Sequence, residues 1–307
     1  MKTLAIYHSD RHYVYQLLMQ FQARLPSHNV VAWRENVAAD YLLSWHPDPK
    51  IFSTQNVKVI FALGAGVDAF LAADIPESIP LVRLEEAGMG DQMLEMALYG
   101  VLHYSRDMVT LNRAQRQKQW LPLSTPKKLP FSTRVGVMGL GQLGRHVAVN
   151  LANIGYSVSG YSRTLKSLDN VACYDDEHFD AFLHHSEVLI NLLPLTAETE
   201  GCLNTTLFER LPKGAFLINI ARGRHLMEED LLNALNSGQL SGALLDVFRT
   251  EPLPKIHPFW SDDRIIVTPH LAAITLPNHA VDQISHNILA FEASRPMTGV
   301  IDRKRGY

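Results

Sequence analysis

Cysteine is scarce in this sequence, which contains only Cys173 and Cys202 among its 307 residues. Two cysteines cannot build a framework of disulfides, and neither belongs to a Cys-x-x-Cys pair or to a Cys/His cluster with zinc spacing. The sequence therefore predicts no metal site and no small fold that depends on disulfides.

Long hydrophobic runs and blocks of positive charge are also missing. No apolar run approaches the roughly 18 residues that a membrane span needs. At the start, the apolar residues Leu4 to Tyr7 precede a His-Ser-Asp turn, which predicts a first strand and not a secretory signal. The formal net charge is −3, and Lys and Arg cluster only in the tail DRKRGY, a balance that argues against a nucleic-acid surface. We therefore expect a cytoplasmic protein whose partner is neither a membrane nor a nucleic acid.

Hydrophobic residues, by contrast, make up 47% of the chain, which is enough for the cores of two domains. Short apolar segments alternate with helical patterns, and this alternation predicts parallel sheets covered by helices. In the first block the expected strands are Leu4–Tyr7, Val30–Trp33, Tyr41–Trp45, Val57–Leu63 and Leu81–Leu84. In the second block they are Arg134–Met138, Ser157–Tyr161, Val188–Asn191, Ala215–Ile220, Gly242–Asp246 and Ile265–Thr268.

A long pattern of helical periodicity separates the two blocks. It runs without proline from Asp91 to about Lys118 and predicts one helix. The next segment contains Pro122, Pro126 and Pro130, and prolines at this density exclude a regular helix and indicate a linker or arm. A last helix is expected over residues 277–294.

The glycine-rich segment VGVMGLGQLGRHVA places Gly139, Gly141 and Gly144 in the spacing G-x-G-x-x-G. It follows an apolar strand and opens a helical pattern, which is the context of a dinucleotide-binding loop. In such a loop the first glycine permits a tight turn, the second lets a pyrophosphate approach the backbone, and the third allows close packing of helix and strand. Free N–H groups at the start of the helix then bind the phosphates.

The end of the next strand indicates which dinucleotide is preferred. Folds that bind NAD usually place Asp or Glu there to hold the ribose 2′-hydroxyl, whereas this chain has Ser162 followed by Arg163. A guanidinium can bind a 2′-phosphate through two hydrogen bonds, and Thr164 and Lys166 add donors. We expect NADP(H) to be preferred and NAD(H) to be possible, and the alternative is a solvated basic loop.

Three further strands are each followed by a polar side chain that can do chemistry. Arg222 follows the run that ends in INIA, Glu251 lies in LLDVFRTEPLP, and His270 lies in RIIVTPH. Ligands of open α/β sheets bind beyond the carboxyl ends of the strands, so these residues are expected to meet a small anionic substrate. Taken singly, each has a simpler explanation as a surface histidine, a loop carboxylate or an arginine that reaches from the sheet edge to water.

Five ordered motifs resemble those of the D-isomer-specific 2-hydroxyacid dehydrogenases: GLGQLG, LPLTAET, LPKGAFLINIARGRHLMEEDLLNAL, GALLDVFRTEPLP and IIVTPHLAA. They cover about residues 50–275, and the short chain, SRTLKS and GAGVD resemble most the NADPH-dependent glyoxylate/hydroxypyruvate reductases within that family. The resemblance implies an α/β protein with two doubly wound parallel-sheet domains. These are a flavodoxin-like substrate domain (1–100 plus 275–307) and a Rossmann coenzyme domain (101–274). It also implies a homodimer.

The resemblance further implies roles for single residues. Arg222, Glu251 and His270 form the expected catalytic set, in which Arg222 binds the 2-oxo acid and Glu251 pairs with His270. The expected substrate contacts are the backbone amides of Gly64, Ala65 and Gly66, and the wall formed by Trp45, for which a place in the core is an equal alternative. The expected cofactor contacts are Gly139, Gly141, Gln142, Leu143, Gly144, Ser162, Arg163, Lys166, Pro194 and, on the nicotinamide side, Asp246.

The expected reaction is the reduction of a small 2-oxo acid, glyoxylate to glycolate or hydroxypyruvate to D-glycerate. A nicotinamide supplies the hydride, His270 gives its proton to the carbonyl oxygen, and Glu251 holds the far ring nitrogen and favours the imidazolium. Arg222 neutralises and orients the substrate. The alternative is a non-enzymatic, NAD(P)-sensing regulatory protein on the same fold, which would retain the same polar residues.

Overall fold

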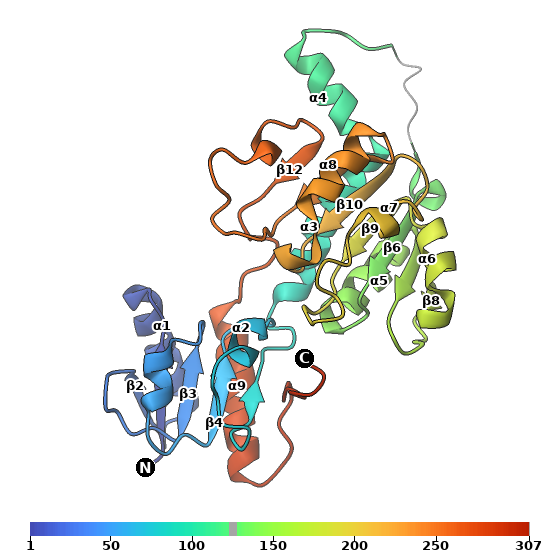
Figure 1. Ribbon diagram of the computed structural model, residues 1–307. Helices are drawn as coiled ribbons and strands as arrows, with labels where there is room; N and C mark the ends of the chain where they lie inside the picture. The colour runs from blue at the N-terminus through green and yellow to red at the C-terminus, as the bar shows by residue number, and fades with distance from the viewer. Residues whose placement is uncertain (123–127, 307) are drawn as a thin grey trace. The chain divides into compact units, whose positions relative to one another are not determined.

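The computed structural model describes residues 1–122 and 128–306, which form two compact units (Figure 1). Unit 1 comprises Met1–Met89 and Thr275–Tyr307, and unit 2 comprises Gly90–Ile274. Pro126, one of the three prolines of the expected linker, lies outside the described residues, whereas Pro130 begins a short 3₁₀ helix, η2 (Pro130–Ser132).

The first boundary between the units lies after Met89, earlier than the expected residue 100. The reason is α3 (Met89–Ser105), which packs along the sheet of unit 2. Gly100 of this helix lies so close to the sheet that a Cβ there would be 2.5 Å from Ile218 Cδ1. Nearly all of α3 therefore belongs to unit 2.

Unit 1 contains a five-stranded parallel sheet in the order β2-β1-β3-β4-β5, the flavodoxin-like order that was expected. Its strands are β1 (Thr3–Tyr7), β2 (Asn29–Ala32), β3 (Tyr41–Ser44), β4 (Val59–Ala62) and β5 (Leu81–Val82). Its helices are α1 (Arg11–Arg24), η1 (Pro49–Ser53), α2 (Asp68–Leu71) and α9 (Pro277–Glu292), and α1 packs against α9. The end of α9 is tied to the N-terminal sheet, because Glu292 Oε1 accepts from Tyr41 Oη at 2.9 Å and lies 2.8 Å from His28 Nε2.

Unit 2 contains a seven-stranded parallel sheet in the order β12-β11-β10-β9-β6-β7-β8. Its strands are β6 (Arg134–Met138), β7 (Ser157–Tyr161), β8 (Val171–Tyr174), β9 (Val188–Asn191), β10 (Ala215–Asn219), β11 (Leu240–Leu245) and β12 (Ile265–Val267). The chain runs outward from β6 to β8, returns to β9 on the other side of β6, and then runs outward to β12. This reversal between β6 and β9 is the switch point at which Rossmann folds bind dinucleotides.

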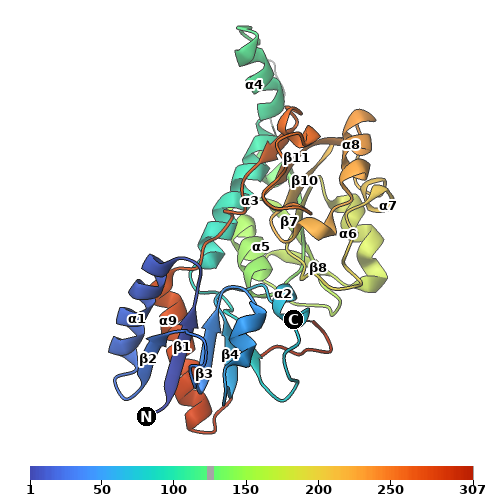
Figure 2. The ribbon, with the colours of Figure 1, turned by 60° about the vertical axis from the view of Figure 1, so that its left-hand side comes forward.

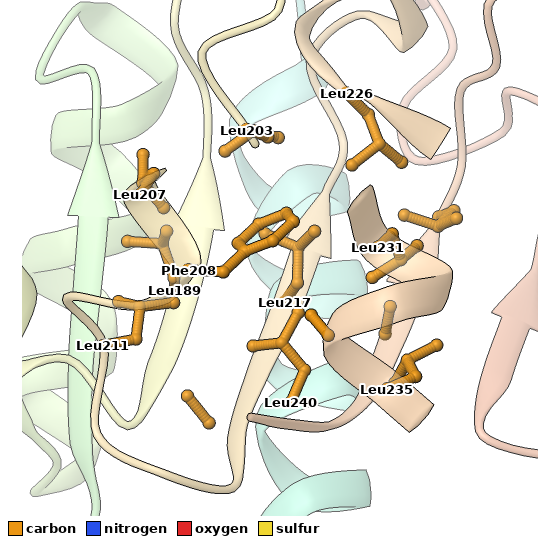
Figure 3. Packing of buried hydrophobic residues seen from close by; sticks show 14 of the residues in the cluster. Leu189, Leu203, Leu207, Phe208, Leu211, Leu217, Leu226, Leu231, Leu235 and Leu240 are labelled. Carbon is orange, nitrogen blue, oxygen red and sulfur yellow. The ribbon is translucent and has the colours of Figure 1, made fainter. Parts of the chain in front are cut away.

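Helices cover both faces of this sheet (Figure 2). Side chains of α3 and α5 (Gln142–Ile154) pack on one face. The other face carries α6 (Phe179–His185), α7 (Thr205–Phe208) and α8 (Glu228–Asn236). Figure 3 shows Phe208 of α7 on that face among leucines that include Leu189 of β9 and Leu217 of β10. The remaining short helices are η3 (Asp176–His178), η4 (Gly223–His225) and η5 (Pro258–Trp260).

One sequence prediction about this unit was wrong, and one strand was missed. The single helix expected over residues 91–118 is two helices, α3 and α4 (Met108–Arg116). They are separated at Asp107, whose φ of 51° is left-handed, a conformation that the short polar side chain of Asp tolerates better than most. The strand β8 was not predicted at all, because it is a short edge strand with only Val171 buried.

Among the described residues, no helix is long and apolar enough to cross a membrane.

Candidate active site

The glycine-rich loop between β6 and α5 has the geometry that its three glycines predict. Gly139 has a φ of +98°, and a Cβ there would lie 2.7 Å from the carbonyl oxygen of Leu192. A Cβ at Gly144 would lie 1.8 Å from the carbonyl oxygen of Gly139, so helix and strand are packed too closely for any side chain. At Gly141, by contrast, nothing lies within 4 Å of such a Cβ. The middle glycine therefore leaves open space in front of the backbone.

That open space lies at the start of α5. Gly141 is the N-cap residue, so no capping side chain covers the N–H groups of Gln142 and Leu143 in the first turn. The positive end of the helix dipole points the same way. This combination of room, free donors and dipole fits the pyrophosphate of a dinucleotide.

At the end of β7, Ser162 and Arg163 occupy the position expected for recognition of the adenosine ribose. The Ser162 hydroxyl donates to the carbonyl oxygen of Thr164 at 2.8 Å, and Lys166 is exposed. Arg163 Nη1 lies 3.5 Å from Oε2 of Glu198, an acid of the loop that follows β9. Both side chains of this pair are exposed, so a 2′-phosphate could replace the carboxylate as the partner of the guanidinium at little cost.

His270 and Glu251 form a direct pair. His270 Nδ1 lies 2.8 Å from Glu251 Oε2, and the second carboxylate oxygen, Oε1, accepts from the backbone N–H of Phe248 at 2.9 Å. The imidazole is about half exposed, with a side-chain accessibility of 49%. A carboxylate that is held from one side and bonded to the ring on the other orients the imidazole and leaves its Nε2 available for chemistry.

The backbone of His270 is held in an uncommon conformation. Its φ is 57°, in the left-handed region that is unfavourable for a histidine. Two hydrogen bonds stabilise this turn, from the His270 N–H to the carbonyl oxygens of Asp246 at 2.7 Å and Thr268 at 3.1 Å. Strain of this kind persists where the surroundings enforce it, as is typical of functional sites.

Asp246 enforces the same turn with its side chain. It is 1% exposed. Its Oδ1 accepts from Thr268 Oγ1 at 2.6 Å and from the Leu271 N–H at 2.8 Å, and its Oδ2 accepts from the Ala272 N–H at 2.8 Å. The structure therefore places this carboxylate beneath the His270 loop as its anchor, and a contact with the nicotinamide remains a prediction.

Arg222 lies in the loop that follows β10, half-buried, and its Nη1 donates to the Ala221 carbonyl oxygen at 2.7 Å. The next residue, Gly223, touches the backbone of Phe248 so closely that a Cβ there would lie 1.9 Å from the Phe248 carbonyl carbon. The N–H of Phe248 donates to Glu251, so the Arg222 loop packs against the loop that orients His270. The structure thus brings all three residues of the expected catalytic set to one edge of the seven-stranded sheet.

The sequence analysis missed a set of buried polar residues behind these loops. Asn191 and Asn219 end β9 and β10 and lie opposite one another in register, and both are 0% exposed, as is His225 of η4. The signal was present in the sequence, since the apolar runs VLIN and AFLIN both end in asparagine. An amide at the end of a buried strand needs hydrogen-bond partners, and two such residues on neighbouring strands indicate a shared network.

Two of the expected substrate contacts come together within unit 1. Trp45 follows β3, and Gly64 follows the neighbouring strand β4. The indole lies over the glycine turn, since a Cβ at Gly64 would be 3.2 Å from Trp45 Cζ3. Trp45 remains 42% exposed and is not a core tryptophan.

A parallel sheet with a glycine-rich loop at its switch point and a histidine–carboxylate pair at the same edge is typical of nicotinamide-dependent dehydrogenases. Residues 98–272 match the family described as "D-isomer specific 2-hydroxyacid dehydrogenase, NAD binding domain". The chain belongs to this family, as its five motifs predicted.

Its relatives are similar over nearly their whole length. The chain is 46% identical over 302 residues to the glyoxylate/hydroxypyruvate reductase A of Yersinia enterocolitica, covering 95% of this chain and 96% of that protein. It is 47% identical over 294 residues to the protein of the same name from Serratia proteamaculans, covering 92% and 93%.

Two solved structures are similar to the whole chain. One is a D-isomer specific 2-hydroxyacid dehydrogenase from Xanthobacter autotrophicus in complex with NADPH and MES, with a TM-score of 0.93, 39% identity and coverage of 100% of this chain and 99% of that one. The other is an NADPH-dependent glyoxylate/hydroxypyruvate reductase from Sinorhizobium meliloti in complex with NADP and sulfate. Its TM-score is 0.93 and its identity 32%, with both chains covered completely.

Proposed function

We propose that this protein reduces small 2-oxo acids with NADPH, converting glyoxylate to glycolate and hydroxypyruvate to D-glycerate. The observation that carries the proposal is the hydrogen bond between His270 Nδ1 and Glu251 Oε2, on the same sheet edge as Arg222 and the glycine-rich loop. The names of relatives at 46% and 47% identity support the choice of substrates.

In this proposal each residue of the chain has a defined task. NADPH, when bound, supplies the hydride, and the glycine-rich loop holds its pyrophosphate. Arg222 binds and orients the oxo acid, which removes the freedom of the reactants before the chemical step. Glu251 holds Nδ1 of His270, so that a proton on Nε2 is aimed at the carbonyl oxygen as it gains charge. Gly64, Ala65 and Gly66 bind the carboxylate through backbone N–H groups, and Trp45 limits the size of the substrate.

The preference for NADPH over NADH is supported by Ser162 and Arg163 at the end of β7, where NAD-binding folds usually have an acid. It is also supported by the two similar structures, which contain NADPH and NADP. Use of NADH remains possible, because the loop around the pyrophosphate is common to both cofactors.

A turnover assay tests this proposal directly. The purified chain is mixed with NADPH or NADH and with glyoxylate, hydroxypyruvate or a bulkier 2-oxo acid, and the loss of reduced cofactor is followed. We expect turnover of both small acids, with a higher kcat/KM for NADPH. Binding of NADPH without turnover of any 2-oxo acid would instead support the non-enzymatic regulatory protein, which the names of the relatives disfavour.

The homodimer and the cytoplasmic location expected from the sequence belong to this proposal as well. Unit 2 has several exposed large apolar side chains, among them Tyr99, Leu102, Trp120 and Phe131, and a contiguous patch of such side chains would mark an interface. Light scattering of the purified chain tests the dimer, and fractionation of cells tests the location.

A further inference from the structure

The buried polar residues behind the Arg222 loop form one connected network. Asn191 Nδ2 donates to Asn219 Oδ1 at 3.0 Å and lies 3.0 Å from His225 Nδ1. Asn219 Nδ2 donates to the carbonyl oxygen of Arg222 at 3.1 Å, and Asn219 Oδ1 also accepts from the Ala221 N–H at 3.4 Å. The amide of Asn219 therefore binds the main chain at both ends of the Ala221–Arg222 dipeptide.

His225 extends the network to a second loop. Its Nε2 lies 3.2 Å from the carbonyl oxygen of Pro194, in the loop that follows β9 and is expected to contact the cofactor. With the proton on Nε2, the neutral ring donates to Pro194 and accepts from Asn191 at Nδ1. Nδ1 also lies 3.1 Å from the carbonyl oxygen of Arg222, so the His225 ring contacts the Arg222 main chain directly. Asn191 Oδ1 in turn accepts from the Leu193 N–H at 3.3 Å. The loops of Pro194 and Arg222 are thus joined through side chains that are fully buried.

The network is larger than simple strand pairing requires. The backbone register between β9 and β10 already joins the strands up to Asn191 and Asn219. Beyond that point the two chains separate into different loops, and the side-chain network holds those loops at a set distance. Buried polar groups of this kind are costly unless all are satisfied, and here their hydrogen bonds end on the two loops that carry expected contacts.

We propose that Asn219 and His225 are positioning residues for Arg222. They fix the backbone of Arg222 so that its guanidinium contacts the 2-oxo acid. His225 also links the position of that backbone to the position of the Pro194 loop. This inference rests on the proposed function, and it assigns to neither residue any contact with substrate. A displacement of about 1 Å at a residue that orients a substrate can lower the rate by about a hundredfold.

The experiment compares three variants at His225 with the wild type, using glyoxylate and NADPH. Leu removes both ring nitrogens. Asn keeps a polar atom near the place of Nδ1, and Gln keeps an amide nitrogen near the place of Nε2. For His225→Leu we expect kcat/KM for glyoxylate to fall by about 10- to 100-fold, mainly through a higher KM. We expect His225→Gln to lie within about threefold of the wild type, and His225→Asn to lie between Gln and Leu.

Asn287→Leu is the matched control. Asn287 is also 0% exposed, and its side chain makes two 2.9 Å hydrogen bonds to the main chain of Thr298 within unit 1. Its loss should lower the melting temperature without a change in the KM for glyoxylate. If His225→Leu does not fold, the order of the KM values of His225→Gln and His225→Asn still tests the inference. Asn219→Asp adds a test of the side-chain donor to the Arg222 carbonyl oxygen.

Two results would overturn the inference. One is a wild-type KM for glyoxylate in His225→Leu or, where that variant does not fold, the same KM in His225→Gln and His225→Asn. The other is a rise in KM that Asn287→Leu shares. An inactive wild type would contradict the proposed function itself, so the two failures are distinguishable.

Discussion

The carboxyl edge of the seven-stranded sheet has two halves that are built differently. In the first, which we call the glycine half, three glycines leave the backbone uncovered. A side chain at Gly139 or Gly144 would clash with the backbone, and a side chain at Gly141 would fill the open space. In the second, which we call the polar half, the loops after β10, β11 and β12 carry the proposed catalytic side chains. Buried Asn219 and Asp246 hold the backbone of two of these loops, those of Arg222 and His270. The first half is suited to a ligand that backbone N–H groups can bind, and the second to chemistry that needs side chains in fixed places.

The difference shows that two routes lead to pre-organisation. Glycine removes the side chain and lets backbones approach, as at Gly144. A buried carboxylate such as Asp246 instead satisfies several N–H groups at once and keeps a strained turn closed. Substitutions in the two halves should therefore differ in their effects on stability, cofactor binding and rate.

The largest effect is expected at His270 in the polar half. His270→Ala should lower kcat for glyoxylate by about 10²- to 10⁴-fold, the usual contribution of a positioned acid. Binding of NADPH should persist, because the glycine half is unchanged. His184→Ala, which alters an exposed histidine of α6, is the matched control. A near-normal kcat in His270→Ala would remove this residue from the mechanism.

Within the glycine half, Gly144 and Gly141 should separate folding from binding. Gly144→Ala should lower the free energy of unfolding by about 3 kcal/mol, because its methyl group would meet backbone and not a movable side chain. Gly141→Ala should leave that free energy nearly unchanged but weaken NADPH binding by about tenfold or more, about 1.4 kcal/mol. Urea unfolding and fluorescence titration measure the two quantities. Equal stability of the two variants would contradict the packing described.

In the polar half, Asp246→Asn should damage both stability and rate. An amide offers a donor where the carboxylate accepts from N–H groups, so at least one buried group loses its partner, at a cost of about 1–3 kcal/mol. Thermal melting measures the stability, and kcat for glyoxylate reports the loosened His270 turn. Unchanged kcat in the folded variant would show that the turn keeps its shape without the carboxylate.

Arg163→Ala should change cofactor preference and leave the chemistry intact. The KM for NADPH should rise by about 10- to 100-fold, as the loss of charge-assisted hydrogen bonds predicts, whereas the KM for NADH should stay within about twofold. Arg210→Ala, which removes a surface arginine paired with Asp180, is the control. Equal effects on both cofactors would contradict recognition of the 2′-phosphate by Arg163.

The smallest effect concerns histidines away from this edge. Burial lowers the pKa of His103, and burial followed by the charge of Arg134 lowers the pKa of His185. Because their folded-state pKa values lie below the unfolded ones, the unfolded chain binds more protons as the pH falls below about 6.5, and the free energy of unfolding decreases. Urea unfolding at pH values above and below that point measures this loss. His103→Gln should make it smaller, and an identical loss would exclude His103 as a cause.

The sequence by itself determined the class of fold, the family, the glycine-rich loop and the three catalytic candidates. Each of these depends on short-range patterns: an apolar strand, a glycine spacing, or a polar residue in the loop that follows a strand. Such patterns can be recognised from the sequence alone because they depend only on residues that lie close together along the chain. The short edge strand β8 and the break at Asp107 were missed because their local signals are weak.

Only the tertiary structure decided which distant residues support the site. Asn191, Asn219 and His225 meet because β9 and β10 are neighbours in the sheet, and Asp246 lies beneath the His270 loop because β11 pairs with β12. Their hydrogen bonds join segments that are far apart along the chain, and a buried amide or carboxylate can be satisfied by many partners. Its role therefore follows from where the folded chain places those partners.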